Sequence, residues 1–271
     1  MEIMKLQDNA EITKAHFTAP FSYFVIESVI EGNTYGEIFV DKLDNPHITI
    51  VWDTKYSINC GGCADKEVLK QAVEFIKSDI LTYDVRQDRG IIKIMYENKE
   101  WEQAILEGVQ GFNYEVYPRS VYRHELDHIP NFQCKDEGIT IKKLDEELVN
   151  NNKLKNHEGL IEELTQMWGS VESFLSKGFG YCAITKDSIA AWCTGEYFSK
   201  AWCGIGIETY EEYQRQGIAA AATVEIIKHC KERNKTPHWD CWKNNIPSVK
   251  TAEKTGFQKL MDYEVVFLKF F

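Results

Sequence analysis

The segment over residues 205–222 constrains this chain more than any other. A strand-like run at residues 205–209 leads through a polar turn into an alanine-rich helical pattern that begins near Gly217. Unpaired N–H groups at a helix start point outward, and the helix dipole adds partial positive charge there. Gly217 has no Cβ, so a phosphate can approach the backbone. We interpret the segment as a diphosphate-binding turn without a Walker lysine; the simpler alternative is an ordinary strand–turn–helix connection.

The composition indicates a folded, acidic protein. Of the 271 residues, 44% are hydrophobic, which is enough to bury a core and excludes a disordered chain. Lys and Arg total 31 against 42 Asp and Glu, for a formal charge of −11. This balance argues against nucleic-acid binding, because phosphate recognition needs a basic surface. The same charge would suit a cationic small substrate.

Targeting signals are not evident in the sequence. Its start lacks a basic stretch followed by an apolar run, and no stretch has the length of a membrane-spanning helix. The eight cysteines are scattered, several within apolar strand-like runs, which is typical of buried free thiols in a reducing compartment. We therefore expect a cytoplasmic protein that does not bind membranes; an oligomer is compatible with this sequence.

Hydrophobic periodicity divides the chain into two α/β halves, joined by a loop-like stretch at residues 130–138. We expect an N-terminal α/β domain over residues 1–130 and a second domain over residues 131–271. In the first half the patterns predict strands at 21–30, 36–40, 47–52, 91–96 and 112–126, and helices at 65–80 and 101–106. In the second half they predict strands at 139–144, 179–185, 188–194, 202–209, 238–242, 257–260 and 264–270, and helices at 145–155, 158–175, 219–233 and 247–255.

The order of these elements, together with the turn, resembles the GNAT superfamily of acyl-CoA-dependent N-acetyltransferases. The family turn pattern, (Gln/Arg)-x-x-Gly-x-(Gly/Ala), is matched by Gln214, Gly217 and Ala219. A second family signature follows at the right distance, with matches at Asn245, Ser248, Glu253, Lys254, Gly256 and Phe257. The resemblance covers about residues 139–271. It implies a GNAT-like α/β (α+β) fold, with a mixed, mostly antiparallel sheet flanked by helices.

The whole chain more loosely resembles the subfamily that includes the zwittermicin A resistance acetyltransferases. The similar features are Glu31-Gly-Asn and the run GEIFVD at residues 36–41. One hypothesis for the first half is a degenerate copy of the same fold, because the loop with Cys60 and Cys63 stands between a strand and a helix, as the turn at residues 214–219 does. That loop lacks the turn pattern, so we expect no second cofactor there. The alternative is an unrelated α/β lid.

The resemblance implies acetyl-CoA as co-substrate and no metal. Pantetheine would lie in a gap between the strands at residues 202–209 and 238–242, and a backbone N–H near Ile207 would stabilise the oxyanion. The diphosphate would bind N–H groups of the turn. The implied cofactor-binding residues are Ile207, Thr209, Gln214, Arg215, Gln216, Gly217, Ile218, Ala219, Asn245 and Ser248.

The implied chemistry is direct attack of an amine on the thioester, which requires a base to remove a proton from the ammonium. Glu208 is the first candidate for this base, although it could simply be a strand residue that faces solvent. Asp240 is the second candidate. Many family members protonate the departing thiolate with a Tyr just before the Glu-Lys-x-Gly-Phe run, but Ala252 occupies that position here. Solvent or Tyr263 would then supply the proton, or the domain is a weak or inactive enzyme.

We therefore expect an N-acetyltransferase that acts on the primary amine of a small molecule, with an aminopolyol antibiotic suggested by the subfamily. A non-catalytic acyl-CoA-binding module is the first alternative, favoured by Ala252. A zinc hydrolase is the second, because His124-Glu-Leu-Asp-His128 matches H-E-x-x-H, although this stretch alternates like a strand. Cys60-Gly-Gly-Cys63 could serve redox or metal chemistry, but no partner pair follows at the spacing of a zinc site.

Overall fold

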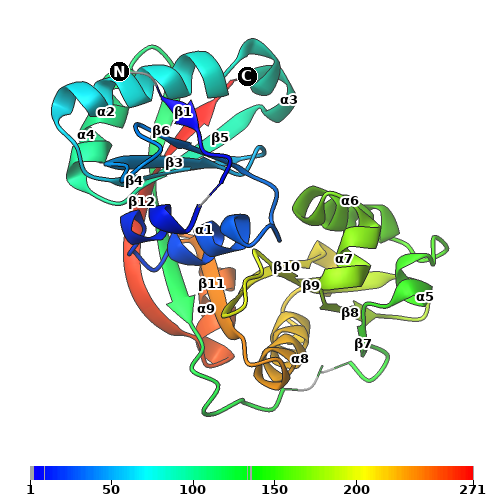
Figure 1. Ribbon diagram of the computed structural model, residues 1–271. Coiled ribbons are helices and arrows are strands. Elements are labelled where there is room, and N and C mark those ends of the chain that lie inside the picture. Colours follow the sequence, from blue (N-terminus) through cyan, green and yellow to red (C-terminus); the bar gives the residue numbers. More distant parts are fainter. Residues whose placement is uncertain (1–2, 9, 133, 135, 271) are drawn as a thin grey trace. The chain divides into compact units, whose positions relative to one another are not determined.

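The computed structural model describes residues 3–8, 10–132, 134 and 136–270. The chain forms two compact units, one from Met1–Arg119 with Asp262–Phe271 and one from Ser120–Met261. These units differ from the expected ranges, since residues 120–130 belong to the second unit and the C-terminal end to the first. Strands β6 (Asn113–Arg123) and β12 (Gln258–Lys269) therefore each run from one unit into the other (Figure 1).

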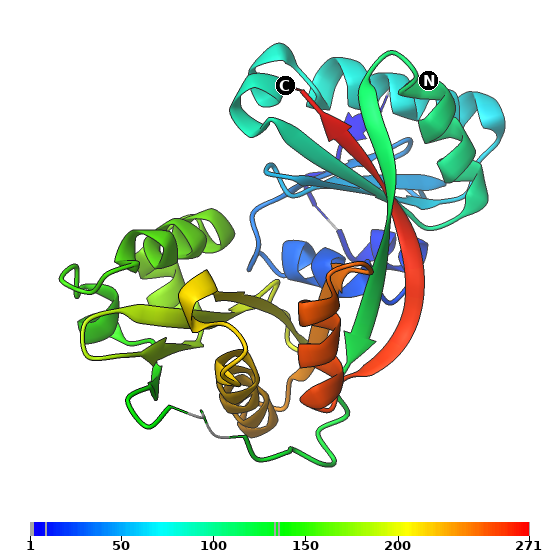
Figure 2. The same cartoon turned by 180° about the vertical axis from the view of Figure 1, so that it is seen from behind.

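In the first unit a mixed sheet separates two helical layers. Helices α2 and α4 cover one face of the sheet and α1 lies on the other (Figures 1 and 2). Strands β1 to β4 pair antiparallel in order, and β5 runs parallel to β4 and antiparallel to β12. Besides β6 and β12, the elements are β1 (Met4–Lys5), η1 (Ala10–His16), α1 (Tyr23–Ile30), β2 (Glu37–Val40), β3 (Ile48–Trp52), β4 (Ser57–Gly62), α2 (Lys66–Phe75), η2 (Ile76–Ile80), α3 (Tyr83–Arg89), β5 (Ile91–Tyr96) and α4 (Lys99–Gly108).

The helix start expected at Asp65 is confirmed. The Asp65 carboxylate accepts hydrogen bonds from the N–H groups of Glu67 and Val68 at 3.1 and 3.0 Å. A carboxylate in this place satisfies two N–H groups that lack helical partners and complements the helix dipole. Leu69 and Val73 then bury one face of α2 in the core.

Two expectations for the first half are wrong. Residues 21–30, predicted as a strand, form helix α1, because Ile26 and Val29 lie one turn apart and bury together against the sheet; this tertiary packing outweighs the β propensity of the run. The stretch from Cys60, predicted as a loop, is the end of β4. Cys60 is 1% exposed, and burial raises the pKa of its thiol, so it is not a reactive cysteine.

In the second unit another mixed sheet has α8 and α9 packed on one face and α6 and α7 on the other (Figures 1 and 2). Strands β7 to β10 pair antiparallel in order, and β11 runs parallel to β10. The elements are β7 (Thr140–Lys143), α5 (Glu146–Val149), α6 (His157–Trp168), α7 (Val171–Lys177), β8 (Gly180–Ile184), β9 (Ile189–Glu196), β10 (Trp202–Thr209), η3 (Glu211–Tyr213), α8 (Ile218–Glu232), β11 (Thr236–Trp242) and α9 (Ile246–Lys254).

Helix lengths in this unit were overestimated from the sequence. The helix predicted at residues 145–155 is only the short α5. The one predicted at 158–175 is two helices, because Gly169 ends α6 at a φ of +79° and the Ser170 hydroxyl caps α7. The two strands predicted near the C-terminus are one continuous β12.

Both units use the same order of elements. Each begins with a strand and helices, continues with three antiparallel strands and a helix, and then adds a parallel strand, a helix and a long strand. The expected fold class, a mostly antiparallel mixed sheet flanked by helices, is confirmed. The shared order also agrees with the hypothesis that the first half is a degenerate copy of the second.

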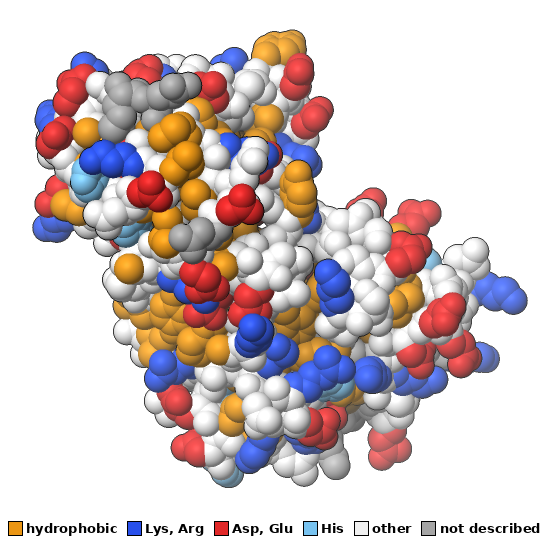
Figure 3. All heavy atoms as spheres, in the orientation of Figure 1, with side chains coloured by type: hydrophobic (Ala, Val, Ile, Leu, Met, Phe, Trp, Pro, Cys, Tyr) orange, Lys and Arg blue, Asp and Glu red, His pale blue; other side chains and the backbone are white. Residues whose placement is uncertain are grey.

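The face seen in Figure 3 carries charged side chains of both signs together with apolar areas. On this face, acidic and basic side chains are interspersed over each unit. Across the described residues, no helix combines the length and the apolar character that crossing a membrane would require.

Candidate functional site

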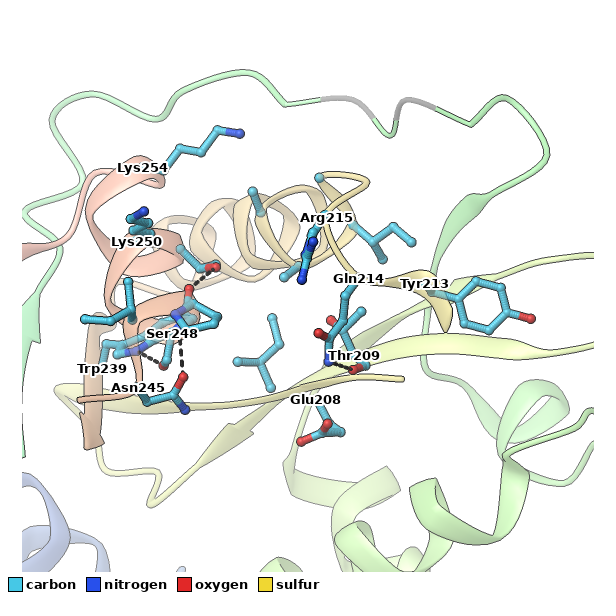
Figure 4. Close-up of a pocket in the computed structure, with 18 residues that line it drawn as sticks. Glu208, Thr209, Tyr213, Gln214, Arg215, Trp239, Asn245, Ser248, Lys250 and Lys254 are labelled. Carbon is cyan, nitrogen blue, oxygen red and sulfur yellow. Dashed lines mark hydrogen bonds between the residues drawn. The ribbon is translucent and has the colours of Figure 1, made fainter. Parts of the chain in front are cut away.

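A cavity of about 660 Å³ opens in the second unit where β10 and β11 diverge (Figure 4). In the described part of the chain, the parallel pairing of β10 with β11 begins at Trp202 and Thr236 and ends at Gly204 and His238. Strand β10 continues beyond this pairing to Thr209. The cavity therefore reaches the backbone between two strands. Its lining residues are Ile207, Glu208, Thr209, Tyr213, Gln214, Arg215, Gly217, Ile218, Ala219, Ala220, Trp239, Asn245, Ile246, Pro247, Ser248, Lys250, Thr251 and Lys254.

The structure brings together nearly all of the predicted cofactor-binding residues at this cavity. The exception is Gln216, whose side-chain amide donates to the Glu212 carbonyl at 3.4 Å and which does not line the cavity. The grouping joins two sequence signatures that lie on different helices, α8 and α9.

The start of α8 is open toward the cavity. Gly217 precedes the helix at a φ of +83°, and no side chain caps its N-terminus, whereas α2, α3, α4, α5, α7 and α9 each have a side-chain cap. Arg215 also has a positive φ, of 63°, a conformation that costs a non-glycine residue energy and is concentrated at ligand-binding turns. The free N–H groups of this first turn can bind an anion.

A hydrogen-bonded network holds the inner end of the cavity. The Asn245 side chain accepts from the Ser248 N–H at 3.2 Å and so caps α9. The Trp239 indole N–H donates to the Ser248 hydroxyl at 3.1 Å, which ties β11 to α9 (Figure 4). At the far end of β10, the Thr209 hydroxyl is buried and has no hydrogen-bond partner among the described residues. A buried hydroxyl in this condition is available to a ligand.

Cationic side chains surround the outer part of the cavity. Arg215 comes from the turn before α8, and Lys250 and Lys254 come from successive turns of α9 (Figure 4). In a chain of formal charge −11, this local positive charge favours an anionic ligand. Sequence reasoning used Lys254 only as a motif match and missed Lys250, although their spacing of four residues on a predicted helix places them on one face.

Glu208 lies on the other side of the sheet from α8 (Figure 4). Side chains alternate along β10, so Glu208 shares a face with Gly204, and the pairing of Gly204 with His238 puts Asp240 on that face too. The two predicted catalytic carboxylates thus lie on one face. Partial burial raises the pKa of Glu208 above its ordinary value, and a hydrogen bond involving the Thr209 backbone offsets part of that rise.

A third carboxylate on this face was missed by sequence reasoning. The Glu196 side chain from β9 lies directly against the Cα of Gly206, so that any Cβ at residue 206 would overlap it. Gly206 and Glu208 are two residues apart on β10, so they lie on the same face of the sheet. The contact depends on the pairing of β9 with β10, which no local sequence pattern indicates.

Neither Ala252, which occupies the position of the family's Tyr, nor Tyr263, the alternative proton donor, lines the cavity. Ala252 is fully buried in an apolar cluster with Trp239 and Phe257. Tyr263 belongs to the first unit, where its ring stacks on Phe21 with centroids 4.1 Å apart and its hydroxyl accepts from the Arg119 guanidinium at 3.2 Å.

The H-E-x-x-H stretch does not form the helix that a zinc hydrolase of this type needs. His124 follows the end of β6, is fully buried, and packs edge-on against Phe257 at 5.3 Å. His128 is exposed on an irregular segment. Within the described ranges, no group of three or more His, Cys, Asp or Glu side chains is placed to hold a metal ion.

The first unit has a smaller pocket of about 310 Å³ between α2 and α4, but among its described residues the gap between parallel strands does not recur. Strands β4 and β5 stay paired from Ser57 with Lys93 to Cys60 with Tyr96. The Trp101 indole N–H and the Asn98 amide donate to carbonyls at the end of β4, at 3.2 and 2.9 Å. The Asp65 carboxylate already occupies the first turn of α2.

Comparisons with known proteins agree with this geometry. A family model described as GNAT acetyltransferase matches residues 15–266. An uncharacterized N-acetyltransferase, YdfB of Bacillus subtilis (strain 168), is 30% identical over 130 residues, which are 48% of each chain, so the match spans about half of that relative.

Two solved structures share the fold. A GCN5-related N-acetyltransferase-like protein of Streptococcus suis 89/1591 has a TM-score of 0.63 at 22% identity, covering 90% of this chain and 92% of that one. A tandem GNAT protein from the clavulanic acid biosynthesis pathway has a TM-score of 0.57 at 9% identity, covering 100% and 99%.

Proposed function

Since the chain belongs to the GNAT acetyltransferase family, we propose that it transfers an acetyl group from acetyl-CoA to the primary amine of a small molecule. The observation that carries this proposal is the uncapped start of α8, which opens into a cavity leading between the diverging strands β10 and β11. An ordinary strand–turn–helix connection would not need a free helix start, a gap in the sheet and a cationic rim at one place.

The residues present suit acetyl-CoA, which when bound supplies an activated thioester carbonyl. N–H groups of the turn from Gly217 to Ala219 would bind the diphosphate. Lys250 and Lys254 would bind further phosphate charge at the rim. The unpartnered Thr209 hydroxyl and the exposed backbone of β10 would bind the pantetheine arm.

On the opposite face of the sheet, Glu208 would act as the base that takes a proton from the attacking amine. Partial desolvation raises its pKa, which makes it a stronger base than a fully solvated glutamate. A backbone N–H of β10 near Ile207 would stabilise the oxyanion that forms on attack. The carboxylates of Glu196 and Asp240 lie on the same face of the sheet.

Two measurements test the proposal. Calorimetry with acetyl-CoA should show binding. Release of CoA should then depend on an added amine, assayed by chromatography because the exposed Cys63 would react with thiol reagents. The panel contains polyamines, aminosugars, an aminopolyol antibiotic, and their N-acetylated forms as controls without a free amine. Binding without release across the panel would favour the non-catalytic acyl-CoA-binding module instead, and no binding at all would contradict both functions.

A further inference from the structure

This inference rests on the proposed acetyl transfer and concerns how the leaving sulfur is stabilised. When the carbon–sulfur bond breaks, its electron pair remains on sulfur, and a hydrogen-bond donor there lowers the barrier. Ala252 offers no donor, and Tyr263 does not line the cavity. The side-chain hydroxyls that do line it belong to Thr209, Tyr213, Ser248 and Thr251.

Position and hydrogen bonding separate these four hydroxyls. The Thr251 hydroxyl already donates to the Pro247 carbonyl within α9 at 2.9 Å. Tyr213 precedes the turn, and its ring points away from the inner end of the cavity (Figure 4). Thr209 ends β10, well beyond the point where the two strands separate. Ser248 remains, and its hydroxyl is held by the Trp239 indole, just beyond the last paired residue of β11.

Ser248 is placed at the point of divergence by Trp239. The last paired residue of β11 is His238, so Trp239 is the first residue beyond the pairing. Its indole is 2% exposed and packs edge-on against Phe257 at 5.5 Å, which fixes the N–H that donates to the Ser248 hydroxyl. A thioester that is to meet an amine from the opposite face must cross the sheet here, because only beyond this point are the strands apart.

The hydroxyl of Ser248 can still donate. Its oxygen accepts the indole N–H, and no described residue accepts its own proton. Accepting one hydrogen bond strengthens a hydroxyl as a donor of the next.

We propose that Ser248 donates a hydrogen bond to the sulfur of CoA during acetyl transfer and that Trp239 positions it. The amine nitrogen bonds to the carbonyl carbon as the carbon–sulfur bond breaks, the electron pair stays on sulfur, and Glu208 accepts the proton from nitrogen. Ser248 keeps its own proton, since a serine hydroxyl is a far weaker acid than a thiol. The sulfur takes up a proton from water, and Glu208 returns its proton to water.

The first test measures binding chemistry rather than turnover. The absorbance of the thiolate is followed with pH to obtain the pKa of the CoA thiol bound to the protein. The same titration with desulfo-CoA, which has no thiol, is subtracted to remove the absorbance of the protein's own cysteines. Ser248→Ala should raise the pKa of the bound thiol by about 1, because a hydrogen bond to the charged thiolate is lost. Trp239→Phe keeps the ring in the core but removes the N–H, and should raise it by less.

The second test uses turnover. Ser248→Ala should lower kcat about tenfold while changing the Kd of acetyl-CoA less than about twofold, because the lost contact forms with the leaving sulfur. Ser176→Ala is the matched control; that hydroxyl donates to the Ser173 carbonyl on the exposed side of α7. It should change neither quantity.

The outcomes separate this assignment from the proposed function. If the pKa of the bound CoA thiol is the same in the wild-type protein, Ser248→Ala and Trp239→Phe, the proposed role of Ser248 is wrong, but the proposed acetyl transfer is unaffected. Wild-type protein that binds no CoA overturns acetyl transfer and this assignment together.

Discussion

Among single residues, Glu208 combines the position and the acidity that the proposed reaction needs. It lies on β10 beyond the last residue paired with β11. Its side chain points away from α8, toward the face of the sheet that also carries Glu196 and Asp240. Partial burial raises its pKa, so its proton affinity comes from desolvation rather than from a partner. Such a carboxylate is a better base than a fully solvated one.

Replacing Glu208 by Gln should lower kcat/KM about 100-fold, because loss of a general base typically costs a factor of this order. Binding of acetyl-CoA should be unchanged, since the side chain lies on the opposite face from the turn. Steady-state kinetics and calorimetry measure the two effects. Glu232→Gln, an exposed residue at the end of α8, is the matched control. Full activity in Glu208→Gln would transfer the base role to Asp240 or Glu196.

The pH profile should show the same group. Glu208 is active only when ionised, so kcat/KM should rise as pH rises through its pKa and fall as pH falls below it. Because that pKa is raised, this acid limb should lie above the ordinary glutamate value of 4.5. The limb should disappear from the residual activity of Glu208→Gln; an unchanged limb in that variant would assign it to another group.

The lysine pair of α9 should contribute to affinity through phosphate charge. The double variant Lys250→Ala/Lys254→Ala should weaken acetyl-CoA binding about tenfold, measured by calorimetry. If the lysines meet the ribose 3′-phosphate, the loss should shrink with 3′-dephospho-CoA. Lys177→Ala, exposed at the end of α7, serves as control. An equal loss with both ligands would place the lysines at the diphosphate instead, and no loss would remove them from the site.

Among the elements, the first turn of α8 is the one on which the proposed coenzyme binding depends. Gly217 is a poor position for testing it, because its positive φ strains any other residue whatever the ligand does. Ala219 lines the cavity within the first turn and has ordinary helical geometry. A change there can alter charge without straining the backbone.

Ala219→Glu should weaken acetyl-CoA binding at least tenfold more than Ala219→Gln. The two side chains have nearly the same size, but only the carboxylate repels a diphosphate. A carboxylate in the first turn also suits the helix dipole, so Ala219→Glu should unfold at no lower temperature than Ala219→Gln. Calorimetry and thermal unfolding give the comparison. Equal affinities of the two variants would count against an anion at this helix start.

Sequence patterns predicted this element well and others poorly. The strand, turn and helix over residues 202–233 follow from local periodicity and from Gly217, and the structure contains them. Helix α1 was predicted as a strand, because its run of aromatic and β-branched residues indicates a strand unless one knows which face the sheet buries. The hydrogen bond from Trp239 to Ser248 and the contact of Glu196 with Gly206 were not predictable, since each joins separate elements through tertiary packing.

In the whole molecule, one order of elements occurs twice, with a gap between the parallel strands in the second unit and paired strands in the first. In the first unit the parallel strands stay paired, Trp101 and Asn98 donate to the end of β4, and Asp65 fills the helix start that α8 leaves free. A bound diphosphate would have to displace the Asp65 carboxylate and would be repelled by it. We therefore expect one cofactor site per chain.

Calorimetry should accordingly give one acetyl-CoA bound per chain. Ala219→Glu should weaken this single binding event without revealing a second one. Asp65→Asn should leave the stoichiometry at one, because the paired strands of the first unit still offer no gap. A stoichiometry of two, or residual binding in Ala219→Glu that Asp65→Asn strengthens, would show that the first unit also binds the cofactor.

A crystal structure of the protein with bound CoA would decide whether the turn before α8 is the coenzyme site. We expect the two linked phosphates on backbone N–H groups of residues 217–220 and the thiol-bearing arm between β10 and β11, with the sulfur beside Ser248. Coenzyme bound elsewhere, or a turn before α8 that holds no phosphate while the coenzyme is present, would contradict it.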